Sequence, residues 1–261
     1  MLFYEMTGFM PGHSGETEQD RTIDLPRPED AVLLLDFDGT LVDIAERPMD
    51  VVVPDRVPAL LSRAMDRTGG RVALVSGRKI ADLEAFLPDF GGSLIGTHGA
   101  ETRLDGAYAR ADGIDDAVVT RLQRLAADFA ALCPRFVVED KPAGVVLHYR
   151  QAEEQAALAM RFMESLEAAA PGFKLQPALM AFELKPDFVG KDVAVERILA
   201  RPGYEGRIPV FAGDDLTDED AIAAVQARGG IGIKIGEAET VARYRVADPA
   251  SLLDRMEAWL A

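Results

Sequence analysis

The chain contains short, uninterrupted apolar runs that alternate with segments of helical spacing. The first run is AVLLL at 31–35, and its unbroken apolar character is typical of a strand buried on both faces. Strands that alternate with helices indicate an α/β fold with a Rossmann-like parallel sheet. The other predicted strands lie at 71–76, within 92–101, and at 208–212 and 231–236. The predicted helices lie at 57–65, 79–86, 193–199 and 221–227.

The middle of the chain has a different pattern, in which helices at 118–132 and 152–170 alternate with two hairpins. The hairpins are formed by FVVED with GVVLHYR and by FKLQP with MAFELK. The order α-β-β-α-β-β indicates an inserted α+β module. We therefore expect a mobile leader at 1–29, a catalytic core at 30–105 and 190–261, and an inserted cap domain at 106–189.

Side chains in the strands of this cap domain alternate between two faces. The face expected to pack on the two helices carries Val145, Leu147, Tyr149, Phe182 and Leu184. The opposite face, expected to point outward, carries Val146, His148, Arg150, Ala181, Glu183 and Lys185. A solvated surface and a ligand-binding surface both fit this polar face.

Charge and cysteine content exclude several function classes. The chain has 44 acidic and 28 basic side chains and a net charge of −16, which argues against nucleic acid or anionic membrane as a partner. No apolar run approaches the length of a membrane span, and the N-terminal stretch is a poor signal peptide. A single cysteine, Cys133, fits a reducing compartment. We expect a soluble cytoplasmic protein.

The first candidate site is the pair Asp36 and Asp38, which directly follows the strand at 31–35 on a loop with Gly39 and Thr40. Two carboxylates this close repel each other unless a cation or protons offset their charge. One can attack an electrophile while the other transfers protons, and together they suit a divalent metal with oxygen ligands. An aspartate-rich turn without catalytic function is the alternative.

A second acidic cluster, GDDLTDED, follows the strand at 208–212. Such a cluster is costly unless it is solvated or binds metal. We expect Asp214 to be a magnesium ligand, whereas Glu219 and Asp220 fit the favourable interaction of acidic residues with a helix N-terminus.

Two further polar residues lie where strands or loops meet helices. Ser76, in VSGR, can hold a phosphate oxygen at a helix N-terminus, cap that helix, or do both. Lys191 begins a helix, which is an unfavourable place for a cation unless an anion lies beside it, although an exposed surface lysine is the alternative. Polar residues that follow parallel strands gather at the carboxyl edge of the sheet, where such folds bind ligands.

These motifs together resemble the haloacid dehalogenase superfamily of phosphotransferases. DFDGT, VSGR, GK and GDDLTDED occur in the order typical of that superfamily. Within it, the stretches FAGDDLTDED, GTHGAE, EDKPAGVVLHYR and FELKP are similar to those of the trehalose-6-phosphate phosphatase family. The resemblance covers about residues 31–261. One departure is Asp192, which stands where the family usually has a glycine after the lysine.

The resemblance implies a role for each motif. Asp36 is expected to attack phosphorus and form an aspartyl phosphate, while Asp38 is the general acid and base. The implied cofactor is Mg²⁺, held by Asp36, the carbonyl of Asp38, Asp214 and Asp215, with Asp218 in support. Ser76 and Lys191 are expected to bind phosphoryl oxygens and neutralise charge. The remaining residues expected to contact substrate are Gly39, Thr40, Gly77, Arg78, Lys141, His148, Arg150, Glu183 and Lys185.

The function that the resemblance implies is Mg-dependent hydrolysis of trehalose 6-phosphate to trehalose and phosphate. Within the same class, the alternatives are phosphatases that act on sucrose-phosphate or mannosyl-phosphoglycerate. From a different class, the alternative is an inactive regulatory module, although Asp36, Asp38, Lys191 and Asp214 are all retained. The sequence does not indicate an oligomeric state.

Overall fold

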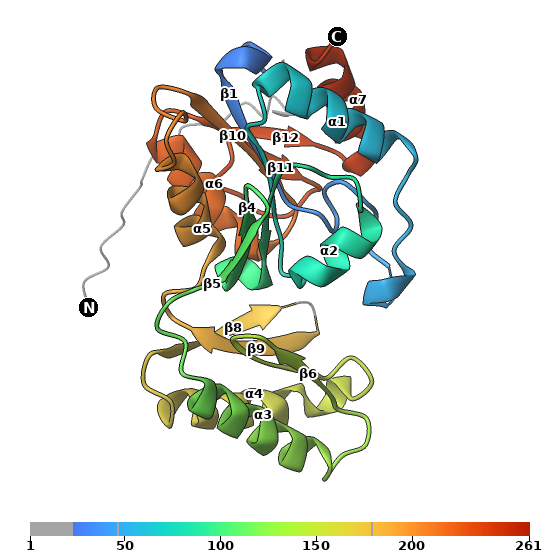
Figure 1. Ribbon diagram of the computed structural model, residues 1–261. Helices are drawn as coiled ribbons and strands as arrows, with labels where there is room; N and C mark the ends of the chain where they lie inside the picture. Colours follow the sequence, from blue (N-terminus) through green and yellow to red (C-terminus); the bar gives the residue numbers. More distant parts are fainter. Residues whose placement is uncertain (1–22, 46, 179) are drawn as a thin grey trace, which may run out of the picture.

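The computed structural model describes residues 23–45, 47–178 and 180–261 (Figure 1). The first 22 residues of the predicted leader lie outside these ranges. Its remaining part, residues 23–29, lies against the core. Ile23 and Leu25 pack on a buried apolar cluster, and the indole of Trp259 donates a hydrogen bond of 2.6 Å to the carbonyl of Pro26. The leader as predicted therefore extends too far along the chain, because its last residues have tertiary contacts.

An eight-stranded sheet forms the core, in the order β12-β11-β10-β1-β2-β3-β4-β5. Its strands from β12 to β3 are parallel, and β4 and β5 are antiparallel additions at one edge. The strands are β1 (Ala31–Leu35), β2 (Val72–Val75), β3 (Ser93–Gly96), β4 (Glu101–Leu104), β5 (Ala107–Arg110), β10 (Ile208–Gly213), β11 (Ile231–Ile235) and β12 (Tyr244–Val246). The predicted α/β core with a parallel sheet is confirmed.

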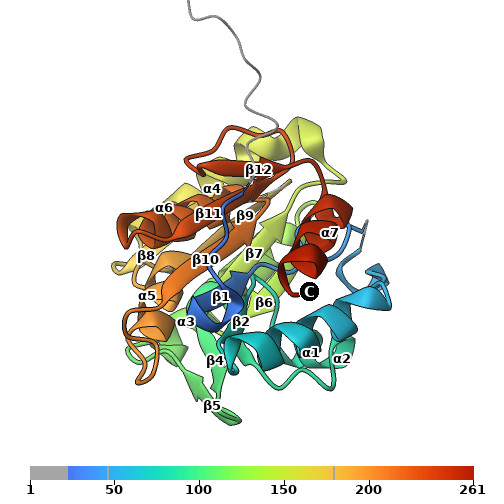
Figure 2. The same ribbon diagram turned by 90° about the horizontal axis from the view of Figure 1, so that it is seen from above.

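Helices cover both faces of this sheet, which is why β1 is apolar at every position. Leu33 and Leu35 belong to the cluster beneath α1 and α7, whereas Val32 and Leu34 belong to the cluster beneath α5 and α6. Figure 2 shows these two layers on opposite sides of the strands. The helices are α1 (Arg56–Thr68), α2 (Ile80–Phe86), α5 (Lys191–Leu199), α6 (Glu219–Ala227) and α7 (Pro249–Trp259).

The inserted module has the predicted order, and its antiparallel sheet runs β6-β7-β9-β8. Its elements are α3 (Asp116–Ala130), β6 (Val137–Lys141), β7 (Gly144–His148), α4 (Ala156–Ala168), β8 (Phe173–Ala178) and β9 (Ala181–Pro186). Val145, Leu147 and Leu184 pack on α3 and α4, as the alternation predicts. The opposite face of the sheet is turned toward the core (Figure 1).

Four elements, β4, β5, β12 and α7, differ from the sequence-based expectations. The predicted cap boundary at residue 105 falls in the turn between β4 and β5, and β5 pairs with β4, so the chain leaves the core sheet only after Arg110. All four residues of β5 are exposed, so the strand lacks the buried apolar run by which the other core strands were predicted. The short β12 and the helix α7 were not predicted, although Asp248 caps α7 through the amide of Ser251 and Pro249 begins it.

No helix in the described ranges is both long enough and apolar enough to cross a membrane.

Candidate active site

The predicted catalytic residues converge at the carboxyl edge of the core sheet. Asp36 follows β1, Ser76 follows β2 and Asp214 follows β10, and these three strands are neighbours in the sheet. Lys191 begins α5 beside them. All four line a cavity of about 350 Å³ whose other wall belongs to the cap. The structure thus brings together residues that lie up to 178 positions apart in the sequence.

Asp36 is buried and is held by two donors. The ammonium group of Lys191 donates to its Oδ1 at 2.7 Å, and the hydroxyl of Thr40 donates to its Oδ2 at 3.4 Å. Lys191 also donates to Oδ1 of Asp218 at 2.6 Å. Burial alone would lower the pKa of Lys191, but Asp218 and Asp36 raise it above its ordinary value, so it remains a cation. Burial raises the pKa of Asp36, although Lys191 opposes that change.

Asp38 is bound on both oxygens by Arg78. The guanidinium Nε and Nη2 each donate to it at 2.6 Å, which is the bidentate geometry of a strong pair. The Arg78 guanidinium also lies over the rings of Phe37 and Phe86, at 5.6 and 5.0 Å from their centres. Arg78 was expected to contact substrate; it lines the cavity and in this structure also holds the expected general acid.

Ser76 does not cap the following helix, because the N-cap residue of α2 is Lys79 and no side chain caps that helix. The hydroxyl oxygen of Ser76 instead accepts the backbone N–H of Arg78 at 3.2 Å and so stabilises the loop between β2 and α2. A hydroxyl that accepts in this way retains its own proton to donate to a phosphoryl oxygen. The two roles are therefore compatible.

Three carboxylates form the candidate metal centre. Asp36, Asp214 and Asp218 each offer an oxygen, and these atoms all lie within 4.8 Å of one another. Burial, followed by the charge of Asp218, raises the pKa of Asp214 to about 6. Gly39 makes the close approach of Asp214 feasible, because its φ is +69° and a Cβ there would lie 2.1 Å from Asp214 Oδ2. Crowded carboxylate oxygens are the ligands that hard divalent cations such as Mg²⁺ prefer, so these residues fit such an ion.

Asp215 was expected among the metal ligands, but the three-carboxylate group contains Asp218 in its place. The carboxylate of Asp215 instead caps the short turn Leu216–Asp218 and accepts the hydroxyl of Thr217 at 3.4 Å. Asp218 is fully buried and accepts the amide of Asp215 at 3.0 Å. In this capping geometry the Asp215 carboxylate lies at the surface, and the Asp218 carboxylate is buried.

Glu219, expected to interact only with a helix N-terminus, also pairs with a buried cation. Its carboxylate accepts Nζ of Lys234 at 3.1 Å, together with the hydroxyl of Thr240 and the amide of Val241. Lys234 contacts the carbonyl of Asp215 at 3.4 Å as well. The Lys234–Glu219 pair thus stabilises the loop that carries Asp214 and Asp215.

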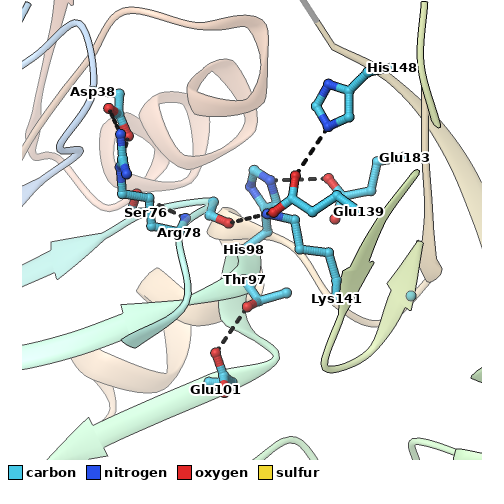
Figure 3. A network of polar contacts seen from close by, with 12 residues as sticks. Asp38, Ser76, Arg78, Thr97, His98, Glu101, Glu139, Lys141, His148 and Glu183 are labelled. Atoms are coloured by element: carbon cyan, nitrogen blue, oxygen red, sulfur yellow. Dashed lines mark hydrogen bonds and ion pairs between the residues drawn. The ribbon is translucent and has the colours of Figure 1, made fainter. Parts of the chain in front are cut away.

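The cap side of the cavity carries Lys141, His148 and Arg150, as expected from the sequence. Between them lies Glu139, which sequence reasoning missed. It binds Nζ of Lys141 at 2.5 Å and the ring of His148 at 3.1 Å (Figure 3). Burial would raise the pKa of Glu139, but His148 and Lys141 lower it to about 2. Glu139 could have been found from the sequence, because it lies two residues before Lys141 and therefore on the same face of β6.

Glu183 and Lys185 are buried between cap and core, with 4% and 3% of their surfaces exposed. The expectation that this face points outward is wrong, because the core covers it. Glu183 Oε2 lies 3.2 Å from Nε2 of His98, a core residue that the sequence reasoning did not single out (Figure 3). His98 lies in the GTHGAE stretch, which was its only signal.

Comparisons with known proteins show the family of the chain. Residues 34–253 match the profile of the trehalose-phosphatase family. The trehalose-6-phosphate phosphatase of Escherichia coli (strain K12) is 34% identical over 212 residues, which cover 81% of this chain and 80% of that protein.

Solved structures give the same fold. A trehalose-6-phosphate phosphatase related protein superimposes with a TM-score of 0.75 at 26% identity, covering 87% of this chain and 96% of that one. A haloacid dehalogenase-like hydrolase from B. subtilis superimposes with a TM-score of 0.61 at 18% identity, covering 87% and 99%. With a haloacid dehalogenase-like fold and a family match over most of its length, the chain belongs to the trehalose-phosphatase family of phosphoric monoester hydrolases.

Proposed function

We propose that this protein hydrolyses trehalose 6-phosphate to trehalose and phosphate through an aspartyl phosphate on Asp36. The observation that carries the proposal is the single cavity in which Asp36, Lys191 and Asp214 face the polar side chains of the cap. Phosphoryl transfer depends chiefly on positioning and charge stabilisation. The core side of this cavity can position the phosphoryl group and stabilise its charge, and the cap side can contact a sugar.

In the first step, a carboxylate oxygen of Asp36 attacks phosphorus as the bond from phosphorus to the sugar oxygen breaks. Lys191 fixes Oδ1 of Asp36, which supports Oδ2 as the attacking atom. Asp38 must enter this step protonated, and it gives that proton to the leaving sugar oxygen. In the second step, Asp38 removes a proton from water, and the water oxygen displaces Asp36 from phosphorus.

Arg78 controls when Asp38 can act. Both oxygens of Asp38 accept from the Arg78 guanidinium, so one of them must be released before it can reach the leaving group. An incoming phosphate attracts the same guanidinium and favours that release. Arg78 thus serves first Asp38 and then the substrate.

We propose Mg²⁺ as the cofactor. Asp36, Asp214 and the main-chain carbonyl of Asp38 would hold it, with Asp218 and Asp215 close by, and it would neutralise charge on the phosphoryl group. Two members of the three-carboxylate group, Asp36 and Asp214, support this assignment, whereas its third member, Asp218, accepts a hydrogen bond from Lys191.

The sugar is read by the cap in this proposal. Lys141, His148 and Arg150 line the cavity. The carbonyl of Gly77 accepts a hydrogen bond from Nζ of Lys141 at 3.4 Å. This contact links the cap to the loop between β2 and α2, called the phosphate loop below. Glu183 and Lys185 complete the polar face. Such a lid excludes water from the reaction as it closes.

The proposed compartment is the cytoplasm, supported by the single cysteine and the net charge of −16. That charge also supports a function without nucleic acid or anionic membrane.

Phosphate release from a panel of sugar phosphates, with and without Mg²⁺, tests the proposal. We expect trehalose 6-phosphate to give the highest kcat/KM, and the activity to disappear with EDTA and return with Mg²⁺. A preference for sucrose-phosphate or mannosyl-phosphoglycerate would reassign the substrate. Absence of phosphate release from every compound would support an inactive regulatory module.

A further inference from the structure

His98 lies at the point where the core, the cap and the phosphate loop meet. Its Nε2 is 3.2 Å from Oε2 of Glu183 on β9 of the cap. Its ring packs on Gly77 so closely that a Cβ there would lie 2.7 Å from both Cε1 and Nε2. The His98 ring therefore contacts both the cap and the phosphate loop, and a movement of either would change its contacts.

The backbone that holds His98 is strained and firmly supported. Thr97 and His98 have φ values of +47° and +54°, in the left-handed region that non-glycine residues rarely adopt. The hydroxyl of Thr97 donates to Glu101 at 3.0 Å, and the same carboxylate accepts the amide of Ile80 at 3.4 Å (Figure 3). Strain of this kind persists where the surroundings over-determine the conformation, and such places are often functional.

The proton on the His98 ring follows from its partner. Glu183 is a carboxylate and can only accept, so Nε2 of His98 carries the hydrogen and Nδ1 presents a lone pair when the ring is neutral. Burial lowers the pKa of His98, which favours the neutral ring, although Glu183 opposes that change. Lys185 and Lys191 are the other charged groups that act on this ring, and both also lower the pKa.

Two buried acceptors at this contact have no hydrogen-bond partner among the residues that the structure describes. They are Nδ1 of His98 and Oε1 of Glu183. A buried polar atom without a partner is costly, so the contact is incomplete as it stands. A ligand that completes it must donate hydrogen bonds, and sugar hydroxyls do so without adding charge.

We propose that His98 is a positioning residue that orients Glu183 for sugar recognition. The Nε2–H group fixes Oε2 of Glu183 when the cap closes and leaves Oε1 to accept a sugar hydroxyl. One imidazole thereby couples the position of the cap to the orientation of Glu183. This inference rests on the proposed function, because it assumes that the cap reads the sugar.

The test compares two substrates in His98→Asn. Asparagine tolerates the left-handed backbone but is too short to reach Glu183. We expect kcat/KM for trehalose 6-phosphate to fall by roughly 10- to 100-fold, mainly through KM, because a hydrogen bond to a charged group is lost. Activity on 4-nitrophenyl phosphate, which needs no sugar contact, should change by less than about threefold. His98→Gln keeps a donor of greater reach and should recover part of the loss.

A double variant separates positioning from direct contact. If His98 acts through Glu183, then His98→Asn should cost little further activity in the Glu183→Ala background. His148→Asn is the matched control, because its ring contacts Glu139, and the factor that it costs should be the same in both backgrounds.

Full multiplication of the losses from His98→Asn and Glu183→Ala would overturn the inference, as would equal losses on the two substrates or no loss on either. These outcomes are distinct from failure of the proposed function. That failure would appear in the wild-type protein, as absent activity on trehalose 6-phosphate while 4-nitrophenyl phosphate is still cleaved.

Discussion

Lys185→Met should make the protein more stable at neutral pH while it damages sugar recognition. Lys185 lies on β9 with 3% of its surface exposed, and burial lowers its pKa from 10.5 to about 8 against the attraction of Glu183. That displacement corresponds to a cost of about 3 kcal/mol for the charged form at pH 7. Methionine removes the charge and keeps an unbranched chain of similar length. The cost of about 3 kcal/mol already includes the attraction of Glu183, so we expect a net gain of about 1–3 kcal/mol once the changed packing is allowed for.

The pH dependence identifies the cause. Between pH 8 and pH 10.5 the unfolded chain holds the Lys185 proton and the folded chain does not, so the free energy of unfolding of the wild type rises with pH across this window. The variant lacks this contribution. Its advantage at pH 7 should therefore shrink and disappear by about pH 10.5.

Urea unfolding at pH 7 and pH 10, followed by circular dichroism, measures both effects. Lys174→Met is the matched control, because Lys174 is the cross-strand partner of Lys185 and is only half-buried. Its effect should stay below about 1 kcal/mol. A Lys185→Met protein that is less stable than the wild type at pH 7, or whose advantage is the same at both pH values, would refute the reasoning.

Further expectations concern the catalytic and metal-binding residues. Asp36→Asn should fold, as near-UV circular dichroism can verify, but lose all turnover, since an amide is a poor nucleophile; Asp38→Asn should lower kcat by roughly 10²–10⁴. Asp214→Ala should weaken Mg²⁺ binding in calorimetry, and an affinity equal to that of the wild type would remove Asp214 from the metal site. Gly39→Ala should cost about 1–3 kcal/mol in urea unfolding and weaken Mg²⁺ binding, because its φ is +69° and the new Cβ meets Asp214; unchanged stability and affinity would contradict this.

The sequence predicts the core well because its signals are local. AVLLL is apolar at every position because α1 and α7 pack on one side of β1 and α5 and α6 on the other. Each catalytic motif directly follows a predicted strand or begins a predicted helix. Parallel strands then bring Asp36, Ser76 and Asp214 to one edge without further information.

What the sequence does not reveal depends on contacts between distant segments. Alternation assigns Glu183 and Lys185 to a polar face, but only the position of the cap shows that the core buries it. The pairing of Arg78 with Asp38 spans 40 positions, and both residues also fit direct roles with substrate. The three-carboxylate group contains Asp218 where Asp215 was expected, and this difference depends on the conformation of the short turn Leu216–Asp218. The pattern of residue types along the chain does not show where the cap lies, which side chains pair or how a turn orients its carboxylates.

The most direct test of the central claim is to trap the phosphorylated enzyme. The protein is mixed with trehalose 6-phosphate labelled with ³²P and quenched in acid during turnover, and the label is located by peptide mapping. We predict an acid-stable, hydroxylamine-labile label on the peptide that contains Asp36, and none in Asp36→Asn. Rapid hydrolysis without a label on that peptide, together with turnover by Asp36→Asn, would contradict it.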